Sequence, residues 1–97
     1  MRRFVGAFQI TEDDEDVELS VYMKKTVDFD GEAYLYAIRN GCYLSKITVA
    51  LTTDYAKKTV TVAAADLVIG ESVALHVGVR GEELGSVFVD DFLGEAV

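Results

Sequence analysis

Five consecutive acidic side chains at positions 12–16 form the densest group of charges and potential ligands in this chain. Carboxylate oxygens are the ligands that Ca²⁺ prefers, and Asp28, Asp30 and Glu32 offer a second set. Neither segment has the full spacing of a calcium loop, so no metal is predicted. Like charges this close repel one another and stay in water, so we predict a solvated loop over 11–16 that can dock a basic partner. The residues assigned to this docking site are Glu12, Asp13, Asp14, Glu15 and Asp16.

Nucleophilic catalysis would have to use the single histidine and the single cysteine. A Cys–His pair needs a third group to orient the base, and nothing in the sequence marks one near Cys42 or His76. His76 fits a partly exposed strand residue, and Cys42 fits a small packing residue after a turn. The acids cluster in loops where water keeps them ionised, and no GxGxxG or GxxxxGK[ST] loop is present. We therefore predict no catalytic residue, no cofactor and no enzymatic activity.

The net charge is −8, from nine Lys and Arg against seventeen Asp and Glu. Such a charge repels nucleic acid and anionic membranes and favours basic partners. One possible role is therefore an inhibitor that blocks a basic nucleic-acid-handling enzyme, such as a defence enzyme, by presenting carboxylates in place of phosphates. The acids outside the run at 12–16 that could contribute are Asp28, Asp30, Glu82, Glu83, Asp90 and Asp91.

Composition indicates one folded domain over residues 1–97, because 51% of the residues are hydrophobic and 27% are charged. A lone cysteine permits no internal disulfide and suits a reducing compartment. The apolar start of the chain stops at Gln9, which is too short for a signal peptide, and no stretch approaches the ~18 apolar residues of a membrane helix. We expect a soluble protein in the cytoplasm or carried on a particle.

Strict alternation of apolar and polar residues dominates the chain and predicts strands with one buried face. An Ala-rich segment at 63–68 is expected to be a crossover link and not a helical turn. A short tail is expected over 92–97. The seven predicted strands lie near 3–11, 17–27, 33–39, 43–53, 58–64, 71–80 and 84–91.

Turn residues separate the predicted strands at short intervals. Asp30–Gly31 and Asn40–Gly41 suit type I′ hairpins, and 54–57 and 80–83 suit four-residue hairpin loops. We therefore predict an all-β fold, a hairpin-rich antiparallel β-sandwich or partly open barrel of about seven strands. The predicted core residues are Val17, Leu19, Val21, Tyr36, Ile38, Ile47, Val49, Leu51, Val60, Val62, Val73, Leu75, Val77, Val87 and Val89.

The eleven residues from Asp30 to Asn40 have the spacing D-x-x-x-Y-x-Y-x-I-x-N. This resembles the D-x-x-x-Y-x-C-x-A-x-N segment of immunoglobulin domains, with Tyr36 in place of the Cys and Ile38 in place of the Ala. The resemblance implies that the Tyr34 hydroxyl bonds back to the backbone at a corner between strands. Two predicted strands precede the segment here and about five precede it in that family, so the likeness describes a local corner and not membership.

Two predicted strands are apolar on both faces, which is unusual for a chain with one core and indicates a second contact surface. The absence of proline also leaves the edge strands without their commonest blocker. The residues assigned to self-association are Phe4, Phe8, Ile10, Tyr34, Tyr36 and Ile38.

The function expected from these features is a non-catalytic interaction or assembly module. It would form homo-oligomers through an apolar strand face or edge, as small viral or phage structural and accessory subunits do. The acidic inhibitor described above is the alternative. A small-ligand-binding β-barrel is a lesser alternative that requires an apolar cavity.

Overall fold

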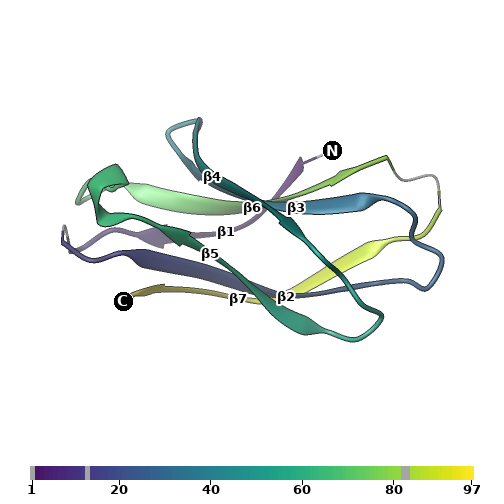
Figure 1. The fold of residues 1–97 in the computed structure, drawn as a ribbon. Coiled ribbons are helices and arrows are strands. Elements are labelled where there is room, and N and C mark those ends of the chain that lie inside the picture. Colours follow the sequence, from purple (N-terminus) through teal and green to yellow (C-terminus); the bar gives the residue numbers. More distant parts are fainter. Residues whose placement is uncertain (1, 13, 82–83) are drawn as a thin grey trace.

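A computed structural model describes residues 2–12, 14–81 and 84–97. Seven antiparallel strands form two sheets stacked face to face (Figure 1). One sheet has the order β1-β6-β3-β4 and the other has the order β5-β2-β7, so the predicted all-β sandwich is confirmed. The elements are β1 (Arg2–Gln9), β2 (Val17–Lys25), β3 (Glu32–Arg39), β4 (Cys42–Val49), β5 (Ala56–Val62), the 3₁₀ turn η1 (Ala64–Asp66), β6 (Ser72–Arg80) and β7 (Val87–Ala96).

Consecutive strands mostly lie in different sheets (Figure 1). β3 and β4 do form the expected hairpin, and the φ angles of +49° at Asn40 and +78° at Gly41 suit a type I′ turn. The other predicted hairpins are wrong, because β2 and β3, β4 and β5, and β6 and β7 each lie in different sheets, so the links between them cross from one sheet to the other. Residues that favour a chain reversal do not decide whether the next strand pairs or crosses. Glu82 and Glu83 lie outside the described residues.

The last strand is longer and later than predicted. β7 ends at Ala96, so most of the expected tail over 92–97 pairs with β2. Asp91 has a φ of +55° and lies where the register of β7 shifts. This bulge breaks the period-two pattern, which is why the alternation did not reveal the second half of the strand. The Ala-rich link between β5 and β6 does contain a single helical turn, η1.

The core lies between the two sheets. The fully buried side chains include Leu19 and Met23 of β2 and Leu75 of β6, and burying one such side chain contributes about 1.5–3 kcal/mol. Tyr36, a predicted core residue, lies on the outer face of the four-stranded sheet instead. Ile38 is buried as predicted, with 7% of its surface exposed, although it lies on the same outer face. The inward residues of β3 are Ala33, Leu35 and Ala37. The other predicted core residues all lie in the core or pack against it.

A glycine of β6 accommodates the Tyr36 ring of β3 on the outer face. Tyr36 lies over Gly78 of β6, where an added Cβ would be 2.6 Å from Tyr36 Cε2. The glycine therefore leaves room for the ring on the outer face. The small alanines of β3 face the opposite sheet, where space is limited by close packing.

All four edge strands carry features that discourage edge-to-edge pairing. β5 has Lys57 and Lys58, β4 has Lys46, and β7 has the bulge at Asp91. β1 has Arg3 and a register shift at Val5. Charges and bulges are the usual devices that protect an exposed edge. Contacts between copies are therefore favoured on the sheet faces and not on the edges.

Candidate functional site

A row of aromatic rings crosses the outer face of the four-stranded sheet. Phe4 of β1 is paired with His76 of β6, and their ring centroids are 5.6 Å apart in an edge-to-face arrangement. Next to His76 lies Tyr36 of β3, whose ring centroid is 5.4 Å from that of Tyr43 of β4. Such ring pairs stabilise one another by about 0.5–1.5 kcal/mol. We call this surface the aromatic face, defined by Phe4, Tyr34, Tyr36, Tyr43, Lys46 and His76.

Lys46 and Tyr34 complete the aromatic face on the side of β4. The Lys46 ammonium lies 4.7 Å from the Tyr34 ring centroid and 5.6 Å from that of Tyr36. Burial, followed by a hydrogen bond to the Glu32 carboxylate, raises the pKa of the Tyr34 phenol, which therefore stays neutral. The resemblance to an immunoglobulin corner implied a backbone acceptor for this hydroxyl, whereas the structure gives it a carboxylate.

The aromatic face differs in charge from the rest of this acidic chain. Among the described strand positions that point outward on this sheet, Glu32 is the one acid, and it is accompanied by the cations Lys46 and Arg80. Phe4 and Tyr43, at opposite ends of the row, are each 58% exposed. Aromatic enrichment together with few acidic groups is the composition of a protein interface.

The structure brings together four of the six residues predicted for self-association: Phe4, Tyr34, Tyr36 and Ile38. Phe8 and Ile10 lie elsewhere, because the register shift at Val5 turns the rest of β1 over. Phe8 is paired with the inward-facing Val73 and packs against the core, and Ile10 is only 2% exposed. Strict alternation placed all three β1 residues on one face, and a bulge reverses that alternation.

Three members of the aromatic face were not predicted as site residues: Tyr43, Lys46 and His76. Alternation places Lys46 and His76 on the more polar side of their strands, but it does not show which strands are neighbours. It places Tyr43 on the apolar side with Ile47 and Val49, and the register shift of β4 opposite Ala37 and Ile38 turns Tyr43 outward. The pairing of β6 with both β1 and β3 is what brings His76 between Phe4 and Tyr36.

The acidic run has two kinds of residue in the structure. Glu12, Asp14 and Glu15 are exposed at one end of the sandwich, and Asp13 lies outside the described residues. Asp16 has a structural role, because its Oδ1 accepts a hydrogen bond of 2.9 Å from the Ala64 N–H and its carbonyl accepts one of 2.9 Å from Val97. Among the described residues of the predicted docking site, Glu12, Asp14 and Glu15 are therefore available to a partner, whereas the Asp16 carboxylate is engaged within the fold.

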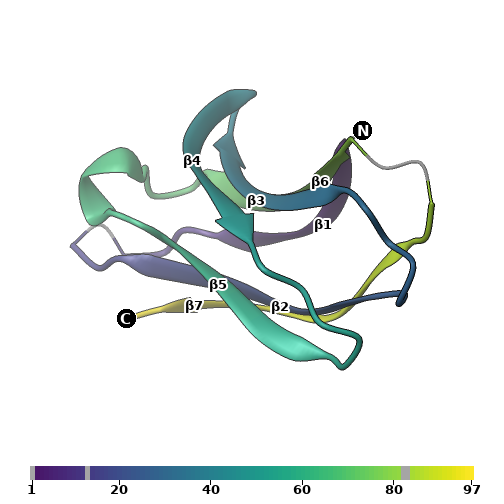
Figure 2. The same cartoon turned by 45° about the vertical axis from the view of Figure 1, so that its right-hand side comes forward.

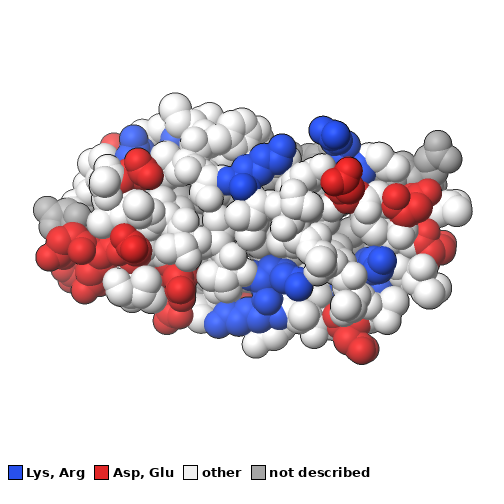
Figure 3. Space-filling view, in the orientation of Figure 1, with Lys and Arg blue, Asp and Glu red and all other residues white. Residues whose placement is uncertain are grey.

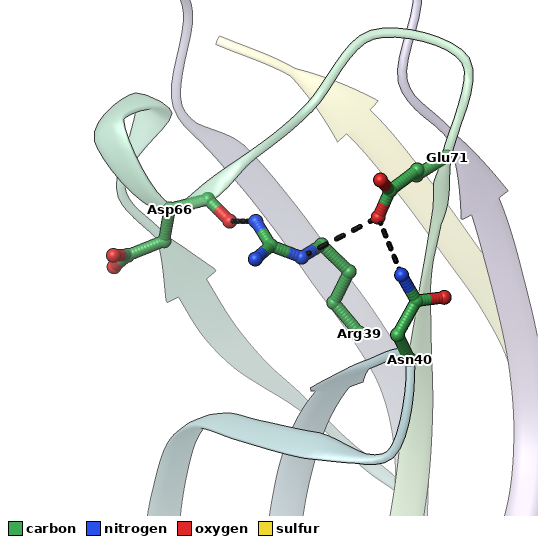
Figure 4. Close-up of polar contacts among 4 residues, drawn as sticks. All are labelled: Arg39, Asn40, Asp66 and Glu71. Carbon is green, nitrogen blue, oxygen red and sulfur yellow. Dashed lines mark hydrogen bonds and ion pairs between the residues drawn. The ribbon is translucent and has the colours of Figure 1, made fainter.

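A polar cluster beside the acidic run joins the β3–β4 hairpin to the crossover that follows β5 (Figure 4). The Arg39 guanidinium donates to the Asp66 carbonyl, and its Nε is 3.5 Å from Glu71 Oε1. Asn40 Nδ2 donates to the same Glu71 oxygen at 2.8 Å. The charge of Arg39 therefore offsets that of Glu71, whereas Glu12, Asp14 and Glu15 carry exposed negative charge at this end.

The acids proposed for nucleic-acid mimicry do not share one surface. Asp28 and Asp30 follow β2, whereas the acidic run precedes it, so the two groups lie at opposite ends of a strand about 30 Å long. In the view of Figure 3, acidic side chains crowd the left end of the molecule and much of the Lys and Arg lies nearer the middle. Of the described acids considered for mimicry, Glu12, Asp14 and Glu15 remain as an anionic surface at one end of the sandwich.

Other chemistry receives little support from the described residues. No three of their His, Cys, Asp and Glu side chains are close enough to hold a metal ion together. Cys42 is exposed, so its predicted packing role is wrong. No helix in the described ranges is long and apolar enough to cross a membrane.

No protein-family model, curated protein or solved structure matches the chain. Its function is therefore inferred from the surfaces described above.

Proposed function

We propose that this chain is a non-catalytic assembly module that associates with further copies of itself through the aromatic face. The observation that carries the proposal is the concentration of aromatic side chains on a sheet face with one acid, in a chain whose net charge is −8. Such a face would gain most of its stability from excluding water, because its charges are few. Subunits of larger particles, including viral ones, are a class of protein that works in this way.

The order of side chains along the aromatic row is suited to a two-fold contact. Phe4 lies at one end, on β1, and Lys46 lies at the other end, on β4, with His76 and Tyr36 between them. A two-fold axis parallel to the strands would place β4 of each copy over β1 of the other. Each exposed Phe4 ring would then meet a Lys46 ammonium, which is a favourable cation–π pair, and the symmetry would repeat it.

The shape of the four-stranded sheet supports the same arrangement. The β3–β4 hairpin bends away from the three-stranded sheet, so that the hairpin end of β4 stands above the rest of the four-stranded sheet (Figure 2). In the two-fold contact, each raised hairpin would lie along the free edge of β1 in the other copy. Arg3 and the register shift of β1 discourage pairing of that edge as a strand, so this part of the contact would be made by side chains.

The first test is the solution mass of the wild-type chain and of a Phe4→Ser, Tyr43→Ser variant, measured by light scattering on a sizing column at low and high salt. We expect the wild type to associate at both salt concentrations, since apolar contacts hold or strengthen as salt rises. Loss of two exposed rings should raise the dissociation constant of this contact by about 10–100-fold.

Val27→Ser is the matched control, because Val27 is 88% exposed and lies in the β2–β3 connection, outside the aromatic face. It should leave the mass unchanged. A wild-type chain that is monomeric at both salt concentrations would contradict the proposal. So would a double variant that associates as strongly as the wild type.

A second candidate function, inhibition of a basic nucleic-acid-handling enzyme, is favoured by the exposed acids Glu12, Asp14 and Glu15. A Glu12→Gln, Asp14→Asn, Glu15→Gln variant removes three of these charges and retains Asp16, which holds η1. The rate of DNA cleavage by a basic nuclease, measured with increasing amounts of added chain, tests this function. We expect inhibition that weakens steeply with salt and is lost in the triple variant.

An Asp28→Asn, Asp54→Asn variant is the control for this experiment, because it lowers the negative charge at the opposite end of the sandwich. If the acidic end is the binding surface, the control should inhibit nearly as well as the wild type. Equal inhibition by the wild type and the triple variant would exclude this function.

A further inference from the structure

A second apolar surface lies on the outer face of the three-stranded sheet, on the side of the sandwich opposite the aromatic face. The Lys24 ammonium is held over it, 4.8 Å from the Tyr55 ring centroid and 5.6 Å from the Phe88 ring centroid. Large exposed side chains gathered on one sheet face mark an interaction surface. We call this surface the second face; its large side chains, each 40–47% exposed, are Tyr22, Tyr55, Phe88 and Leu93.

Two charges beside the centre of the second face can complement a second copy of the chain. Tyr22 of the central strand β2 is paired with Lys57 of β5 on one side and with Asp90 of β7 on the other. The backbones of Lys57 and Asp90 are two strand spacings apart, about 9–10 Å, and Tyr22 lies between them. Among the ion pairs of the described residues, none joins Lys57 to Asp90. A two-fold axis parallel to β2 exchanges the two sides of the sheet, so that Lys57 of each copy faces Asp90 of the other.

We propose that the second face binds a second copy of this chain in this two-fold arrangement. Tyr22 then meets the same residue of the other copy at the centre, and the two Lys57–Asp90 pairs lie on either side of it. Along the neighbouring row of side chains, Phe88 of each copy comes opposite Tyr55 of the other. The contact therefore has an aromatic centre with one Lys57–Asp90 pair on either side. Lys24 and Glu18, which also point outward from β2, come opposite the same residues of the other copy, so their repulsion opposes the attraction of the two pairs.

Two self-complementary faces on opposite sides of one sandwich have a consequence for assembly. A copy that uses one face forms a closed pair, whereas a copy that uses both joins two neighbours and the assembly grows as an open stack. This open stack rests on the proposed function, because it needs the aromatic face as well. The second-face contact itself does not, and the two can be tested separately.

The test is a charge exchange at low salt, made on the Phe4→Ser, Tyr43→Ser background so that the aromatic face does not contribute. Lys57→Asp or Asp90→Lys alone places like charges opposite each other and should raise the dissociation constant at least about tenfold. An equimolar mixture of the two variants restores opposite charges in every mixed pair, and the Lys57→Asp, Asp90→Lys double variant restores them in every pair. Lys57 and Asp90 are both exposed, so neither change should disturb the fold.

The expected masses are a dimer for the background variant, monomers for each single charge variant, and dimers for the mixture and the double charge variant. Wild-type chain should exceed a dimer and grow with concentration. Single charge variants that remain dimeric, or a mixture that remains monomeric, would overturn the second-face contact. A monomeric background variant with a dimeric wild type would overturn it and leave the proposed function intact. Equal masses for wild type and background variant would instead refute the proposed function.

Discussion

Replacing Gly85 with alanine should destabilise the protein by about 3 kcal/mol. Gly85 has a φ of +83°, and an added Cβ would lie 2.5 Å from the backbone N and Cα of Phe29 and 2.5 Å from Thr26 Oγ1. The contacted atoms of Phe29 belong to the main chain, so no rotation of a side chain relieves the overlap. For a chain of this size the expected decrease in melting temperature is roughly 12–24 °C, measured by circular dichroism.

The expected loss is large because Gly85 lies where two inter-sheet connections meet. Thr26 N–H donates to the Ser86 carbonyl at 2.9 Å, and Ser86 N–H donates to Thr26 Oγ1 at 2.9 Å. Leu84 N–H donates to Asp30 Oδ1 at 3.2 Å. Separating the two connections to make room for a methyl group would break these bonds, at about 1 kcal/mol each.

Gly70→Ala is the control that isolates the effect of close approach from the effect of backbone conformation. Gly70 also has a positive φ, +89°, but no atom lies within 4 Å of its added Cβ. It should lose only about 1 kcal/mol, the usual cost of a left-handed conformation for a residue with a side chain. Similar losses in the two variants would mean that the connections can separate freely, which would contradict the tight contact at Gly85.

The strands of this protein could be predicted from the sequence, but the order of the strands in the sheets could not. Alternating apolar residues locate β2 and β6 directly, because one face of each is buried. Asp30–Gly31 and Asn40–Gly41 are chemically similar turns, yet the first connects two sheets and the second closes a hairpin. The difference arises from which partner buries the next strand, and that is a property of the whole chain.

The aromatic face could be predicted only in part for a related reason. Tyr34 and Tyr36 stand out because β3 is apolar on both sides, so one side needs a second contact. His76 and Tyr43 join them only through strand pairing. Val5 has no sequence feature that marks a bulge, so Phe8 and Ile10 were grouped with Phe4 although they face the core.

The second large effect is expected at Gly6 and Gly94, which join the edges of the two sheets. An added Cβ at Gly6 would lie 2.5 Å from Phe92 Cδ2, and one at Gly94 would lie 2.7 Å from Phe8 Cβ. Phe92 of β7 therefore packs over Gly6 of β1, and Phe8 of β1 packs over Gly94 of β7. Gly6→Ala and Gly94→Ala should each destabilise the protein by about 2 kcal/mol, because both rings pack against the core and have little room to move.

Specific rescue can distinguish this packing from a general intolerance of alanine. Shortening the ring that overlaps should recover part of the loss, so Phe92→Leu should partly rescue Gly6→Ala and Phe8→Leu should partly rescue Gly94→Ala. Coupling energies of about 1 kcal/mol are expected for these two pairs of substitutions. Values near zero are expected when Gly6→Ala is combined with Phe8→Leu, or Gly94→Ala with Phe92→Leu. Equal coupling energies in all four combinations would contradict the specific packing of Phe92 on Gly6 and of Phe8 on Gly94.

The same variants connect the closure of the sandwich to its proposed assembly. β1 is an edge strand, and Phe8 secures one half of it against β7 while Phe4 in the other half belongs to the aromatic face. If Gly6→Ala loosens β1, it should also weaken association through the aromatic face, in proportion to its loss of stability. The second face lies on β2, β5 and β7, so Lys57–Asp90 pairing should respond to Gly6→Ala much less. Light scattering on Gly6→Ala chains, with and without the second-face charge changes, would measure this difference.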